Sequence, residues 1–79
     1  MSLIKRMENK EAKLEKKIEI KMKNIEDINS KFLNREISKK EFNKKKKHDE
    51  EIIKKMNNNL RMLKGEVARR KRLSNINNI

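Results

Sequence analysis

Apolar residues in the first third of the chain recur at intervals of three and four, the heptad spacing of a helix that buries one narrow stripe. Two charged residues, Glu11 and Lys21, interrupt this stripe. The pattern predicts one helix from about residue 2 to residue 33. The stripe consists of Ile4, Met7, Glu11, Leu14, Ile18, Lys21, Ile25, Ile28 and Phe32.

A second helix is predicted to begin at Ser38, because Ser38 and Glu41 have the spacing of a capping box. Ile37 before the cap and Phe42 at the fourth helical position form the matching hydrophobic staple. The connection between the two helices is only about four residues long, which is short enough to force an antiparallel hairpin.

The second helix is expected to run from about 38 to 73, with residues 74–79 as a flexible tail. Together these patterns predict an all-α fold with one domain over residues 1–73, an antiparallel helical hairpin with a coiled-coil-like seam. The apolar positions of the second helix are Phe42, Ile52, Ile53, Met56, Leu60, Leu63, Val67 and Leu73.

Folding the chain about residues 35 and 36 sets apolar residues opposite one another along most of the seam. Asp49 then comes near Lys21, and we expect the two to form a partly buried pair that fixes the register more than it stabilises the fold. Lys45 and Lys46 would face Ile25. The expected apolar pairs are Phe42 with Ile28, Ile53 with Ile18, Met56 with Leu14, Leu63 with Met7 and Val67 with Ile4.

The amino-acid composition predicts that this hairpin associates with further copies of itself. Of the 79 residues, 33% are hydrophobic and 46% are charged, with one Gly and no Pro. Such a chain has too few apolar residues for a self-sufficient core, so we expect the seam to be completed in a homo-dimer or homo-tetramer. The residues predicted at the oligomer interface are Ile18, Met22, Ile25, Ile28, Phe32 and Phe42.

The formal net charge is +12, which favours a polyanion as partner. The positive charge is concentrated in the second helix, where Glu66 is the only acidic residue after Glu51. The predicted nucleic-acid-binding residues are Lys44, Lys45, Lys46, Lys47, Lys54, Lys55, Arg61, Lys64, Arg69, Arg70, Lys71 and Arg72.

Readers of single strands stack bases on aromatic rings, and the only aromatic residues are Phe32 and Phe42, both assigned to the seam. Duplex DNA, contacted through its phosphates without strong sequence preference, is therefore the favoured partner, and double-stranded RNA stays open. Membrane binding is disfavoured because the apolar stripe is used for pairing. The alternative from another class is a coiled-coil scaffold whose positive charge is incidental.

The two basic runs suggest a geometry for such binding. Lys46 and Arg70 lie 24 positions apart in one helix, a separation of about 36 Å, or one turn of B-DNA. A rod with basic groups at both ends is suited to kinking one duplex or bridging two.

The sequence offers little for catalysis. His48 has no partners at metal-ligand spacing, there is no Cys, and a two-helix hairpin has no substrate cleft. We therefore expect no enzyme activity, cofactor, metal or small-molecule substrate. No secretory signal or membrane span is visible, so a cytoplasmic location at the nucleoid is expected.

As a short, cysteine-free, lysine-rich hairpin with basic runs at 44–47 and 69–72, the chain resembles the small basic helical nucleoid proteins of methanogenic archaea. That resemblance implies homo-oligomers that compact, kink or bridge duplex DNA. More locally, "KFLNREISKKEFNKKK" is similar to the helix-turn-helix core of short bacterial C-terminal oligomerisation modules, although Glu36 stands where that pattern has Gly. This second likeness implies an interaction module.

Overall fold

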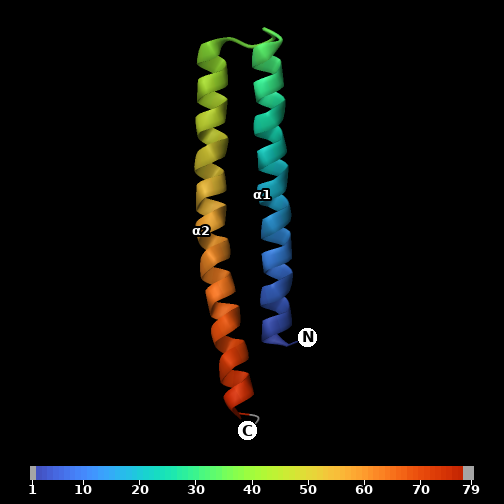
Figure 1. Cartoon of the computed structure of the whole chain (residues 1–79), viewed down its shortest axis with the longest axis vertical. Helices are drawn as coiled ribbons and strands as arrows, with labels where there is room; N and C mark the ends of the chain where they lie inside the picture. Colours follow the sequence, from blue (N-terminus) through green and yellow to red (C-terminus); the bar gives the residue numbers. More distant parts are fainter. Residues whose placement is uncertain (1, 78–79) are drawn as a thin grey trace.

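The computed structural model describes residues 2–77, with side chains described from residue 2 to residue 73. Two helices, α1 (Leu3–Leu33) and α2 (Lys39–Asn77), pack side by side in opposite directions. Their connection lies at one end of a rod that measures 62 × 17 × 14 Å (Figure 1). The expected all-α antiparallel hairpin is therefore confirmed.

The starts of both helices agree with the sequence. The Ser2 hydroxyl accepts a hydrogen bond from the amide of Lys5 at 3.2 Å, and the Ser38 hydroxyl accepts one from the amide of Glu41 at 3.1 Å. Each cap satisfies an amide that has no partner within its helix. Only this half of the expected capping box forms, since no bond returns from the Glu41 carboxylate within the described residues.

The end of α1 is a Schellman motif, built without glycine. The amide of Glu36 bonds to the carbonyl of Lys31 at 2.8 Å, and the amide of Arg35 bonds to that of Phe32 at 3.0 Å. This pattern of bonds requires that the residue directly after the helix cap adopts the left-handed conformation. Arg35 supplies it with φ at 59°.

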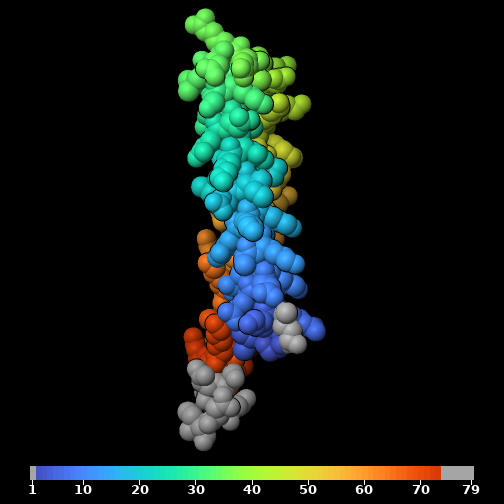
Figure 2. Space-filling view, turned by 90° about the vertical axis from the view of Figure 1, so that its right-hand side faces the viewer, coloured from blue at the N-terminus to red at the C-terminus, as the bar shows by residue number. Residues whose placement is uncertain are grey.

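The end of α2 differs from the sequence expectation. We expected the helix to stop at Leu73, but it continues to Asn77. Residues 74–77 contain neither Gly nor Pro, so nothing in them breaks a helix. Of the expected tail, residues 78 and 79 lie outside the described part of the chain. Beyond the start of α1, α2 projects as a single helix (Figure 1). Seen from the side, α1 lies in front of α2 (Figure 2).

Burial along α1 confirms the predicted heptad stripe, because each of its nine positions is buried or half-buried. Along α2 the stripe runs from Phe42 to Arg70, and Leu73, which was predicted in it, is exposed. It also includes charged residues, of which Asp49 is buried and Lys46 and Arg70 are half-buried. The positions of the α2 stripe are Phe42, Lys46, Asp49, Ile53, Met56, Leu60, Leu63, Val67 and Arg70.

Two contacts mark how the seam is joined. The expected pair of Lys21 and Asp49 is present, with Nζ 3.5 Å from Oδ1. Near the loop, the rings of Phe32 and Phe42 stack with their centroids 4.5 Å apart, a contact that the sequence did not reveal. The five expected apolar pairs stay predictions. The fully folded hairpin buries few residues deeply: Ile18, Val67 and Asp49.

Candidate nucleic-acid interface

All twelve predicted nucleic-acid-binding residues lie on α2, but two of them do not face outward. Lys46 and Arg70 occupy the seam, whereas the other ten are exposed. Their side chains keep 43% and 41% of their surface exposed, so the rod with basic ends at these two residues stays a prediction. The half-buried position of Lys46 agrees with the expectation that it faces the other helix.

The seam accommodates Lys46 through its neighbours. Its ammonium lies 5.5 Å from the centroid of the Phe42 ring and 3.9 Å from a carboxylate oxygen of Glu50. The aliphatic part of a lysine packs on apolar surface while the ammonium stays in water. Lys46 thus has an ion pair within its own helix, whereas its neighbours Lys44, Lys45 and Lys47 have no ion pair within the described residues.

The basic run near the end of α2 has four cations, and two carboxylates compensate about half of its charge. Arg69 donates to Glu66 at 2.6 and 3.2 Å, and Arg70 donates to the same carboxylate at 2.9 Å. Lys71 reaches across to Glu8 on α1 at 3.5 Å. Of this run, only Arg72 has no ion pair within the described residues.

This cluster shifts two pKa values in the directions that its contacts require. The hydrogen bond from Arg69, and more weakly the charge and hydrogen bond of Arg70, lower the pKa of Glu66 below its ordinary value. The same hydrogen bond raises the pKa of Arg69. Both groups are therefore charged at neutral pH.

A second ion pair between the helices lies next to the pair of Lys71 and Glu8. Lys64 contacts Glu15 at 3.1 Å, seven residues from the Lys71 and Glu8 pair on both helices. Residues seven apart lie on the same side of a coiled-coil helix. One flank of the hairpin is therefore close to electrically balanced.

The outer face of α2 is different. Lys40, Lys47, Lys54 and Arg61 follow one another at seven-residue intervals and form a row, which we call the cation row. All four are exposed, and none has an ion pair within the described residues. Successive members are about 10.5 Å apart along the axis, so the row is about 32 Å long.

Sequence reasoning missed the first member of this row. Lys40 precedes the run of four lysines and was not predicted as a binding residue. The signal was its seven-residue spacing to Lys47, which has meaning only once the seam of α2 is known. Lys44 and Lys55 are exposed beside the row and extend its positive surface.

The exposed cations of α2 are suited to holding phosphates. Within the described residues, no group of three or more His, Asp or Glu side chains is placed to hold a metal ion. His48 borders a shallow surface depression with Glu41, Lys44 and Lys45. Neither described helix has a stretch long and apolar enough to cross a bilayer.

The six residues predicted at the oligomer interface differ in how much of their surface the hairpin leaves exposed. Ile18 is only 9% exposed and is covered by the hairpin itself, so it has little surface left for a second copy. Met22 is exposed, and the other four are half-buried: Ile25, Ile28, Phe32 and Phe42.

Comparison of the chain with models of protein families, with curated proteins and with solved structures found no match. The two resemblances noted in the sequence therefore stay expectations.

Proposed function

We propose that this protein is an architectural DNA-binding protein, which contacts the phosphates of duplex DNA with little sequence preference and compacts, kinks or bridges it. The observation that carries the proposal is the cation row, Lys40, Lys47, Lys54 and Arg61, exposed and without ion pairs in the described chain. Unpaired cations gain most from phosphate, because no internal ion pair has to be broken. With this function the protein would act in the nucleoid.

The length of the row supports a duplex as the ligand. At about 32 Å it nearly equals one turn of B-DNA, which rises about 34–36 Å. A straight rod laid along the duplex would bring its cations to backbone on both sides of a groove within that turn. This geometry adds a second row of similar length to the one predicted from Lys46 to Arg70.

The stacked aromatic pair argues against a reader of single strands. Proteins that bind single strands stack bases on exposed rings. Phe32 and Phe42 instead stack on each other and are half-buried in the seam. Phosphate contacts alone do not separate DNA from RNA duplexes, so double-stranded RNA is the alternative ligand within the same mechanism.

Self-association is the second part of the proposal. The hairpin leaves Ile20 and Met22 each 56% exposed, and a dimer or tetramer would cover such residues. Multiplying the cation rows in one assembly favours bridging between duplexes. The competing scaffold function has this same observation in its favour, but it leaves the cation row without a role.

A gel-shift titration on duplex DNA at two salt concentrations tests the proposal. Affinity should fall steeply as salt rises, because phosphate binding releases counterions. A parallel titration on duplex RNA of the same sequence decides between the two nucleic acids. Absence of binding to either duplex at low salt would overturn the proposal and favour the scaffold.

A further inference from the structure

Two equally exposed apolar side chains, Ile20 and Met22, lie two residues apart on α1. Residues two apart on a helix do not share a face. Seen from the seam, Ile20 and Met22 therefore lie toward opposite flanks of the hairpin. The charges around them are also opposite.

Ile20 borders a shallow groove between the helices, lined by Lys17, Ile20, Lys21, Ile52 and Met56. Lys17 also lines a second shallow groove, which continues the first along the rod. We call the two together the lysine-rimmed groove. No carboxylate lines either part, and the second part is lined by Lys10, Lys13, Leu14, Lys17, Asn59 and Leu63.

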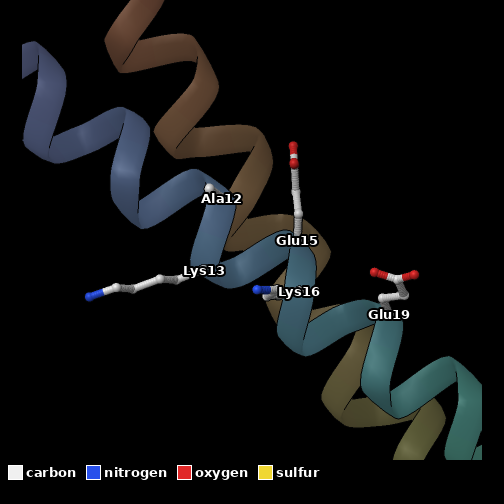
Figure 3. A pocket seen from close by; sticks show the side chains of 5 residues that line it. All are labelled: Ala12, Lys13, Glu15, Lys16 and Glu19. Atoms are coloured by element: carbon white, nitrogen blue, oxygen red, sulfur yellow. The ribbon is translucent and has the colours of Figure 1, made fainter.

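Met22 has carboxylates around it instead. Glu19 lies three residues before it and Glu26 four residues after it, so both are its neighbours on the helix surface. Neither has an ion pair within the described residues. Glu15, Glu19, Met22 and Glu26 form what we call the carboxylate flank, in which Glu15 already contacts Lys64 of its own chain. Lys13 extends away from the side on which Glu15 and Glu19 stand (Figure 3).

We propose that a second copy of the chain docks its carboxylate flank onto the lysine-rimmed groove of the first. Apolar surface then meets apolar surface at Met22 and Ile20, and carboxylates meet lysines around them. Groove against groove would bring lysines together, and flank against flank would bring glutamates together. Complementary charge therefore favours contact between two different surfaces of the same chain.

The consequence is an assembly that does not close as a symmetric dimer. A contact between two different surfaces leaves one groove and one flank open at the ends, and it continues into a row or closes as a ring. None of the four residues of the cation row belongs to either surface. The inference rests on the self-association part of the proposed function and does not depend on DNA.

Two double variants test the inference by mixing. The groove variant carries Lys17→Glu with Ile20→Ser, and the flank variant carries Glu19→Lys with Met22→Ser, all at exposed positions. Sedimentation velocity at low salt without DNA should show that the wild type associates and that each variant alone is a monomer. An equimolar mixture should contain a heterodimer, because one variant keeps its flank and the other keeps its groove.

The possible failures separate the inference from the proposed function. A wild type that stays monomeric at high concentration overturns the inference and the self-association part of the proposed function, but not duplex binding through the cation row. If the wild type associates but either variant alone does so equally well, or the mixture forms no heterodimer, only the inference is overturned. Circular dichroism checks the helices, and the single variants Lys17→Glu and Glu19→Lys take the place of a double variant that has unfolded.

Discussion

The ammonium of Lys21 lies 3.5 Å from a carboxylate oxygen of Asp49 and ties the middle of α1 to α2 within the seam. Asp49 is among the most buried residues of the hairpin, with 7% of its surface exposed, whereas Lys21 reaches partly into solvent. A buried charged pair of this kind is often neutral for stability but selects one alignment of the helices.

Removing one member and removing both should therefore have opposite effects. Lys21→Met leaves Asp49 buried without its partner and should lower the free energy of unfolding by about 1–3 kcal/mol. Lys21→Leu with Asp49→Leu should raise the melting temperature and change the oligomeric state. Thermal melts and sedimentation measure both. A double variant with unchanged melting and oligomeric state would show that the pair has no role in register.

Arg35 provides a prediction about the loop. A non-glycine residue in the left-handed region is strained by about 1 kcal/mol, and glycine at this position removes the strain. Arg35→Gly should raise the free energy of unfolding by about 0.5–1 kcal/mol, measured by urea denaturation. Asn34, with φ at −83°, is the matched control, and Asn34→Gly should not stabilise the hairpin. Equal effects of both substitutions would argue against strain at Arg35.

The cluster around Glu66 predicts a dependence on acid. Because Arg69 lowers the pKa of Glu66 in the folded chain, the cluster stabilises the fold at pH values above the ordinary 4.5. This stabilisation is lost as the pH falls through the lower folded pKa. Glu66→Gln should therefore be less stable than the wild type at pH 7, and the difference should vanish near pH 2. Thermal melts across this range would contradict the assignment if the difference persisted in acid.

The heptad stripe of α1 and the caps of both helices could be predicted from the sequence because they depend on local spacing. Ser38 and Glu41 are three residues apart, and their bond needs nothing from the other helix. The seam position of Lys46 needed both helices, because only folding the chain about residues 35 and 36 set it opposite Ile25. Its contact with the Phe42 ring was not predicted, because that contact depends on the side-chain conformation that Lys46 adopts.

The candidate site was harder to predict, because the availability of a cation depends on carboxylates elsewhere in the fold. Lys64 and Lys71 look as basic as Lys54 in the sequence. Glu15 and Glu8 reach the first two across the hairpin, and no carboxylate reaches Lys54. Only the packing of α1 on α2 reveals this difference.

The same difference leads to a prediction about the two basic runs. Lys44→Gln with Lys47→Gln removes two cations without ion pairs, whereas Arg69→Gln with Arg70→Gln removes two that already contact Glu66. Exposed ion pairs are weak, so the arginines still contribute, but part of their gain on phosphate is offset by the pair they break. The lysine variant should lose more affinity for duplex DNA at equal salt. An equal or larger loss of affinity in the arginine variant would contradict this prediction and would indicate that the main DNA-binding site lies at the end of α2.

The most direct test of the central claim is the salt dependence of duplex DNA binding in two matched variants. Lys47→Gln with Lys54→Gln removes two members of the cation row, and Lys5→Gln with Arg6→Gln removes two exposed cations from α1. Each phosphate contact contributes about −0.9 to the slope of log affinity against log salt, so the row variant should flatten the slope by about 1.8. The α1 variant should keep the slope of the wild type. Equal slopes in all three proteins, or equal flattening in both variants, would contradict binding through the outer face of α2.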